Sequence, residues 1–270
     1  MELRFVKMNP TRNMTILVET PVPRTRHGEI AKQLMAQDSV GAEQVGYIEQ
    51  ATNSAATARL QMMGGEFCGN ASMSLAALLA MRDGLEDKAE RGYTLEVSGA
   101  NDLVRCNVTR DKDSYIGEVD MPLPDEIGVA TPDVSHRYPV ARFPGITHLI
   151  VPENDLTRES AEKFAPIWCE NLNADALGLL LTDNDLTHMR PLVYVRGSGS
   201  SVWECGCGSG TAALGAYRAY SATRDTHMDV SQPGGVIRVL ARVENGRVTA
   251  LRIRGRVLPV CAGTAWVDAE

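Results

Sequence analysis

The sequence of 270 residues predicts an α+β protein, and three observations support this class. Short β-branched or alternating runs, typical of strands, outnumber the stretches with helical character. A cysteine motif occurs once in each half of the chain. A segment rich in proline and acidic residues, Glu118–Ser135, lies between the halves and is predicted to link two similar domains.

The elements follow from local pattern. Runs bounded by turn residues are predicted as strands, in order Met14–Val18, Thr94–Ser98, Leu103–Val108, Thr147–Val151, Pro191–Val195, Val236–Val243 and Val248–Val257. Stretches of helical character are Glu29–Gln37, Asn70–Arg82, Glu159–Asn171 and Ser209–Ser221. We therefore expect antiparallel sheets wrapped around a few helices.

Composition and charge narrow the class of protein. With 44% apolar and 23% charged residues, the chain is typical of a soluble globular protein. The net charge of −7 argues against a nucleic-acid or anionic-membrane surface. No run of 18 or more apolar residues and no signal peptide are recognised. We expect a cytoplasmic protein whose six cysteines are reduced.

The repeated motif is the main functional signal. It occurs as GGEFCGNASMS around Cys68 and as ECGCGSGTAALGAY around Cys207, which lies 139 residues later. Both copies continue into Ala- and Leu-rich sequence predicted to be helical. A motif present once in each half suggests a site built from two matching parts.

A thiol at the start of a helix is suited to acid–base chemistry. The first turn presents unpaired backbone N–H groups and partial positive charge, which lower the pKa of a thiol and bind a carboxylate. Gly69 and Gly208 would let a ligand approach the backbone closely. Asn70 and Ser209 are predicted N-cap residues.

Two such helix starts facing each other would hold a carboxylate and leave its α-carbon between two sulfurs. One thiolate would remove the α-proton while the other thiol delivers a proton to the opposite face. General acid–base catalysis supplies about 10²–10⁴-fold of such a rate enhancement. The remainder must come from oriented N–H dipoles that stabilise the developing charge. This predicts a two-base racemase.

The chain resembles the diaminopimelate epimerase family of amino-acid racemases that work without pyridoxal phosphate. Within it, the likeness is closest to the histidine racemase branch of staphylopine-type metallophore pathways. The residues that carry the resemblance are NPTRNMTILV (Asn9–Val18), EQVGYIE (Glu43–Glu49), the two cysteine motifs and QPGG (Gln232–Gly235). The cysteine motifs are specific as a pair, whereas QPGG alone would be weak.

The resemblance implies a fold, an active site and a mechanism. It implies two pseudo-symmetric domains, 1–122 completed by 258–270, and 123–257, each a sheet around a central helix with the site in the cleft between them. Cys68 and Cys207 would be catalytic, and Asn13 would contact the substrate. No cofactor or metal is implied. The expected partner is a small molecule, the amino-acid substrate, and relatives of this fold suggest a homodimer.

Departures from the epimerase pattern bear on the substrate. Val195 stands where the family has a glutamate before Arg196, and Ile146 stands where it has an asparagine. A distal ammonium group would lose its counter-charge there, which disfavours diaminopimelate. Phe67 and Trp203 could line a pocket for a flat imidazole ring. Histidine is therefore the expected substrate, with other single-headed amino acids and diaminopimelate as alternatives.

Several residues have alternative interpretations. Glu66 and Glu204 are either substrate contacts or solvated charges, and Arg196 either binds the substrate or points outward from a Gly/Ser-rich loop. Cys205 is a rival to Cys207, although the Gly-Ser-Gly-Thr run favours Cys207. A zinc site or a dinucleotide fingerprint near Cys207 has little support from spacing. Paired thiols forming a reversible disulfide would instead indicate a redox protein.

Overall fold

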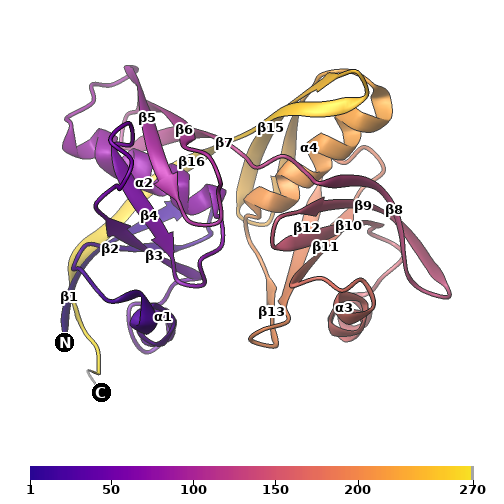
Figure 1. Ribbon diagram of the computed structural model, residues 1–270, viewed down its shortest axis with the longest axis horizontal. Coiled ribbons are helices and arrows are strands. Elements are labelled where there is room, and N and C mark those ends of the chain that lie inside the picture. Colours follow the sequence, from indigo (N-terminus) through magenta and orange to yellow (C-terminus); the bar gives the residue numbers. More distant parts are fainter. Residues whose placement is uncertain (269–270) are drawn as a thin grey trace. The chain divides into compact units, whose positions relative to one another are not determined.

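The computed structural model describes residues 1–268 and is a mixed α+β protein dominated by strands (Figure 1). Its chain divides into two units, one made of residues 1–120 with the chain from Arg254 onward, the other of residues 121–253. The predicted linker Glu118–Ser135 contains this boundary, but nearly half of it is strand β8 (Glu126–Asp133). The linker interpretation is therefore wrong for 126–133. Proline is tolerated there because β8 lies at the edge of its sheet.

In the first unit, each of two helices connects a pair of parallel strands. Its elements are β1 (Glu2–Pro10), β2 (Thr15–Val18), α1 (His27–Met35), β3 (Gln44–Glu49), β4 (Ala58–Met62), α2 (Gly69–Arg82), β5 (Glu90–Val97), β6 (Val104–Asp111) and β7 (Ser114–Asp120). Neighbouring strands follow one another in chain order. The pairs β2–β3 and β4–β5 are parallel, across α1 and α2 respectively. The expected antiparallel sheet therefore also contains parallel pairs, because a helical crossover returns the chain in its original direction.

The second unit holds a six-stranded sheet with a helix on each face. Its elements are β8, β9 (His136–Phe143), β10 (Ile146–Pro152), α3 (Arg158–Asn171), β11 (Ala176–Thr182), β12 (Met189–Val195), β13 (Ser200–Trp203), α4 (Gly208–Ala222), β14 (Thr226–Gln232), β15 (Gly235–Glu244) and β16 (Arg247–Trp266). The sheet order is β13-β12-β11-β10-β9-β8, with β10–β11 parallel.

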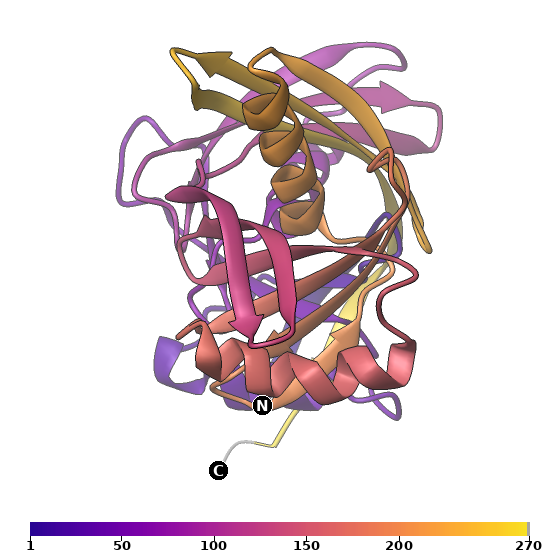
Figure 2. The same cartoon turned by 90° about the vertical axis from the view of Figure 1, so that its right-hand side faces the viewer.

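Strand β11 shows how the sheet separates α3 from α4. Leu179 and its neighbours two residues away pack with Trp168 of α3. Leu180 points the other way, where a Cβ on Gly210 of α4 would come within 2.8 Å of it. Because alternate strand residues face opposite sides, α3 and α4 cover opposite faces of the sheet (Figure 2).

Strand β16 belongs to both units. Its residues up to Ile253 are part of the second unit, and those from Arg254 onward are part of the first. There, Val257–Trp266 pairs antiparallel with β1, so β1 lies between β2 and β16. Residues 269 and 270 of the C-terminal segment, which the resemblance assigns to the first domain, lie outside the described residues.

Helices α2 and α4 are buried around most of their circumference, as expected for helices that are apolar on every side. Small residues allow strands to approach them closely. A Cβ on Gly117 of β7 would lie 2.9 Å from Met73 of α2, and a Cβ on Gly215 of α4 would lie 2.3 Å from Val239 of β15. All four predicted helices are confirmed, with ends within two residues of those expected.

Two kinds of feature are absent from the described part of the chain. Within residues 1–268, no helix is both long and apolar enough to cross a membrane. The same residues contain no group of three or more His, Cys, Asp or Glu side chains placed to hold a metal ion.

Candidate active site

Cys68 caps helix α2 with its own sulfur. It is the N-cap residue, in extended conformation, and its Sγ accepts a hydrogen bond of 3.4 Å from the N–H of Ala71. The Ser72 hydroxyl donates to the Cys68 carbonyl at 2.8 Å. The prediction that Asn70 is the N-cap is wrong, because Gly69 and Asn70 already belong to the first turn of the helix. The reactive atom therefore receives a first-turn N–H directly.

A chain of polar side chains leads from Cys68 to Glu43. The Cys68 thiol donates to Gln44 Oε1 at 3.0 Å, and Gln44 Nε2 donates to Asn13 Oδ1. Asn13 Nδ2 in turn donates to Glu43 Oε2 at 2.8 Å. Burial raises the pKa of Glu43, and the hydrogen bond from Asn13 opposes this. The predicted contact residue Asn13 thus lies in one network with Cys68.

Gln44 and Glu43 were not predicted as site residues. The pair lies at the start of EQVGYIE, a segment that carries the family resemblance but no local signal of chemistry. Gln44 reaches Cys68 across 24 residues because it begins β3, whose antiparallel pairing with β4 returns the chain to this end of β3 shortly before Cys68. The crossover through α1 places Gln44 opposite Thr15 of β2, next to Asn13.

The loop before Cys68 is fixed by the turn after β5. Ser98 Oγ donates to the Glu66 carbonyl at 2.8 Å. Gly99 has a φ of +71°, and a Cβ there would lie 2.3 Å from the Phe67 nitrogen. Glycine is therefore required at 99 both by its backbone conformation and by space. Glu66 is exposed and Phe67 half-buried, so both predicted contact residues sit on a rigid, accessible loop.

Cys207 caps helix α4 in the same way. It is the N-cap residue, and its Sγ accepts a hydrogen bond of 3.3 Å from the N–H of Gly210. The Thr211 hydroxyl donates to the Cys207 carbonyl at 2.7 Å, as Ser72 does for Cys68. Ser209 is not the N-cap predicted from sequence. Like Gly208 it lies within the first turn, and its hydroxyl is 3.5 Å from the Cys207 sulfur.

The surroundings of Cys207 overturn the expectation of an acidic thiol there. Its side chain is buried, with the residue only 2% exposed. Burial raises the pKa of Cys207 well above its usual value, and the hydrogen-bonded carboxylate of Glu204 raises it further. The Gly210 N–H and the Ser209 hydroxyl lower it, but they do not compensate. Cys207 is therefore held as a thiol, with a carboxylate beside it.

Two other predicted contacts are engaged elsewhere. Trp203 packs against the core under α3. Its Nε1 donates to Glu162 at 2.7 Å, and the Arg158 guanidinium lies 5.1 Å from the centre of its ring. Arg196 follows β12 and forms a 3.1 Å ion pair with Asp175. Neither side chain is directed to Cys207, which lies at the start of α4 on the opposite face.

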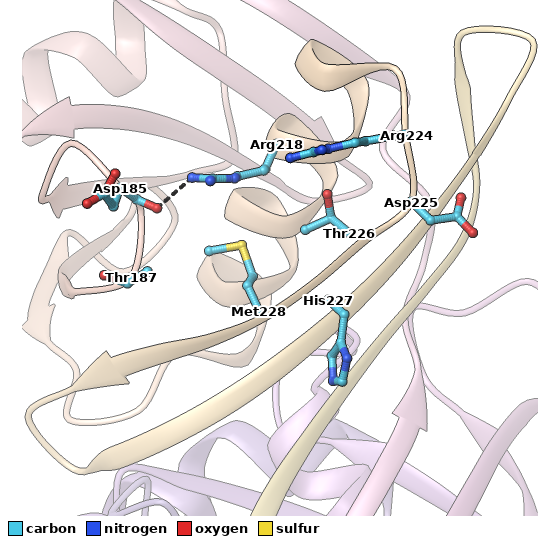
Figure 3. Close-up of a pocket in the computed structure, with 8 residues that line it drawn as sticks. All are labelled: Asp185, Thr187, Arg218, Arg224, Asp225, Thr226, His227 and Met228. Atoms are coloured by element: carbon cyan, nitrogen blue, oxygen red, sulfur yellow. Dashed lines mark hydrogen bonds between the residues drawn. The ribbon is translucent and has the colours of Figure 1, made fainter.

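A surface hollow beside α4 is not part of this site. It has a volume of about 280 Å³ and is lined by Arg218 and Arg224 at the end of α4, together with Asp185 and His227 (Figure 3). Arg218 donates to the Asp185 carbonyl at 2.7 Å. Because α4 spans 15 residues, roughly 22 Å separates this end from Cys207.

Comparison with known proteins then places the chain. A profile described as the histidine racemase CntK N-terminal domain matches residues 2–266. The chain belongs to this histidine racemase family. The histidine racemase of Staphylococcus aureus strain Mu50 is 33% identical over 98% of both chains. That of Fusobacterium nucleatum subsp. nucleatum strain ATCC 23726 is 32% identical over 98% of this chain and 97% of its own. The expectation of an isomerase is confirmed at the level of the family.

Solved structures resemble the chain in fold. A "probable proline racemase" from Agrobacterium radiobacter K84 matches with a TM-score of 0.73 and 15% identity, over 99% of this chain and 93% of its own. A hydroxyproline epimerase from Agrobacterium vitis matches with a TM-score of 0.71 and 14% identity over the same shares. The histidine racemase family therefore has a fold also found among these other racemases and epimerases.

Proposed function

We propose that this protein interconverts L- and D-histidine, with Cys68 and Cys207 as its two acid–base groups. The observation that carries the proposal is the matching geometry of the two cysteines in a chain of the histidine racemase family. Each is the N-cap of a buried helix, and each sulfur accepts the N–H three residues ahead. A carboxylate of the substrate would be bound by the first-turn N–H groups of α2 and α4.

The reaction needs one thiolate and one thiol. The α-carbon–hydrogen bond breaks as the thiolate takes the proton, and the electron pair is held in the enolate-like substrate. The other thiol then gives its proton to the opposite face, so a new carbon–hydrogen bond forms and this sulfur becomes the thiolate. The protein ends with the two protonation states exchanged and no net change in charge.

The position of Glu204 supports the assignment of Cys207 as the cysteine that is protonated before the reaction begins. Its carboxylate touches the Cys207 sulfur and disfavours the thiolate, so Cys207 begins as the proton donor. A half-buried carboxylate next to a buried thiol also offers a route by which its proton exchanges with water. Asn13, Glu66, Phe67, Gly69, Asn70, Gly208 and Ser209 remain proposed substrate contacts, whereas Arg196 and Trp203 are bound to other groups.

Three finer expectations belong to the same proposal. The two units would be pseudo-symmetric copies of the diaminopimelate epimerase-like fold. In both, a helix, an antiparallel strand pair and a cysteine-capped helix follow in this order, with one further strand, β13, in the second unit. The protein would form a homodimer, which light scattering in solution would test. Its product would feed metallophore biosynthesis, which a metallophore synthase gene beside this one would support.

The test measures deuterium incorporation at the α-carbon in D₂O, over a panel of L-amino acids and meso-diaminopimelate. We expect histidine to exchange fastest. Cys68→Ser and Cys207→Ser should each lower racemisation by at least about 10²-fold, because a serine hydroxyl is a far weaker acid than a thiol.

Cys205→Ser is the matched control, since it removes a half-buried thiol two residues from Cys207 and should leave racemisation at the parental rate. Parental racemisation in Cys68→Ser or Cys207→Ser would refute the two-thiol mechanism. Faster exchange of meso-diaminopimelate than of histidine would refute the substrate.

A further inference from the structure

The QPGG segment forms the turn between β14 and β15 and has no part in the chemistry proposed above. Its first residue, Gln232, ends β14 and is only 5% exposed. A buried amide side chain must satisfy both its oxygen and its nitrogen, and here both are used at Cys207 or one step from it.

Gln232 and Thr211 close a ring of hydrogen bonds around Cys207. The Cys207 N–H donates to Gln232 Oε1 at 2.7 Å, and Gln232 Nε2 donates to the Thr211 hydroxyl at 2.8 Å. That hydroxyl donates to the Cys207 carbonyl at 2.7 Å. Both peptide groups that flank the Cys207 side chain are therefore tied to the same pair of residues.

Backbone hydrogen bonds also hold the residues that precede Cys207. The Gly234 N–H donates to the Cys205 carbonyl at 2.7 Å, and the Glu204 N–H donates to the Pro191 carbonyl at 3.0 Å. In the first unit, Ser98 after β5 likewise donates to the carbonyl two residues before Cys68. Each cysteine loop is thus anchored by the turn that follows the next strand.

We propose that Gln232 and Thr211 are positioning residues for Cys207, which they act on through its backbone. The inference rests on the proposed function in so far as Cys207 is a reacting group. Cys207 is outside the regular part of α4, so its extended conformation (φ −101°, ψ 105°) is not imposed by the helix. The ring supplies that constraint and fixes the direction of Sγ. A displacement of about 1 Å at a reacting atom can cost on the order of 10²-fold in rate.

The experiment compares Gln232→Met, Thr211→Val and Thr211→Ser. Methionine and valine keep the approximate shape and remove the hydrogen bonds, so kcat should fall by about 10²-fold with little change in KM. Thr211→Ser keeps the hydroxyl and should stay near the parental rate, because Ser72 makes the equivalent bond to Cys68.

The second readout is the rate of alkylation of Cys207 by iodoacetamide, followed by mass spectrometry with Cys68 in the same molecule as the internal reference. Loosening the ring should raise the Cys207 rate several-fold in Gln232→Met and Thr211→Val and leave Cys68 unchanged. Because this readout needs no turnover, it separates failure of the ring from failure of the racemase proposal.

Two results would overturn the inference. One is a parental alkylation rate and parental kcat in Thr211→Val. The other is a Thr211→Ser variant that loses as much as Thr211→Val, since the hydroxyl would then not be the group that matters. If Gln232→Met does not fold, as judged by circular dichroism, the two Thr211 variants decide the question alone.

Discussion

The two cysteines share a capping geometry and differ in their surroundings. Cys68 is half-buried, and its thiol donates to a neutral amide, Gln44. Cys207 is fully enclosed and has the Glu204 carboxylate against its sulfur. A helix start favours a thiolate, but loss of solvent and a neighbouring negative charge disfavour it more strongly at Cys207. The position of a cysteine in a helix therefore does not by itself set its acidity.

Glu204→Gln tests this at the level of one residue. The change removes the negative charge that disfavours the thiolate, so the pKa of Cys207 should fall and its alkylation should begin at lower pH. Alkylation rates of Cys207 between pH 6 and 10 would show the pH at which alkylation begins. Glu162→Gln, on the α3 face of the same sheet, is the control and should leave this onset unchanged. An onset that stays or moves upward in Glu204→Gln would contradict the assignment.

At the scale of elements, helix α4 packs closely against β15 because Gly215 has no side chain. Gly215 faces β15, and an added Cβ would lie 2.3 and 2.7 Å from the two methyl groups of Val239. The contact is with a branched side chain on a paired strand, which cannot swing aside as the end of a long chain could. Close packing here holds the helix that carries Cys207.

Gly215→Ala should lower the free energy of unfolding by about 1–3 kcal/mol, because overpacking outweighs the better helix propensity of alanine. Gly28→Ala in α1 is the matched control, since no atom lies within 4 Å of its added Cβ. It should be neutral or stabilise by up to about 1 kcal/mol. Urea denaturation of both variants would measure the difference, and equal stabilities would show that α4 can shift away from β15.

The strands show which local patterns are informative. Runs with turn residues on both sides were recognised, such as Pro191–Val195, which is the end of β12. Strand β11 gives no such signal, because ALGLLLT is buried on both faces and does not alternate. Strand β8 resembles a linker because of its proline and acidic residues, although an edge strand accepts them.

At the scale of the whole molecule, each unit contains a hydrophobic cluster of its own, and strand β16 contributes residues to both units. The first unit contains a cluster around Leu3, Ile30 and Tyr47 that includes Ala265 from the end of the chain. The second contains a cluster around Trp168 under α3. Because β16 contributes to both units, distant parts of the sequence complete the first core.

His148 makes the stability of the molecule sensitive to acid. It lies on β10 over Gly178, is fully buried, and has no hydrogen-bond partner within the described chain for either ring nitrogen. Burial lowers the pKa of His148 to about 3. The unfolded chain binds this proton near pH 6.5, so stability falls as the pH drops from about 6.5 towards 3, by up to about 5 kcal/mol.

His148→Leu should flatten the pH dependence of the free energy of unfolding between pH 6.5 and 3. Denaturation curves of variant and parent would be compared at each pH. The difference at pH 8, where the histidine is neutral in both states, measures the change in packing alone. An identical slope in both proteins would show that His148 does not carry the effect.

Local sequence predicts the α+β class, the four helices and the two cysteines at helix starts, because each of these features depends on residues that are close together in the chain. Repetition of the Cys68 motif around Cys207 was enough to predict paired helix starts. The surroundings of the cysteines, in contrast, depend on the tertiary structure. Gln44 reaches Cys68 across 24 residues and Gln232 reaches Cys207 across 25, and burial is a property of the whole fold. Hydrogen bonds and desolvation act through space, so the acidity and orientation of the thiols follow from the packing and not from the motif.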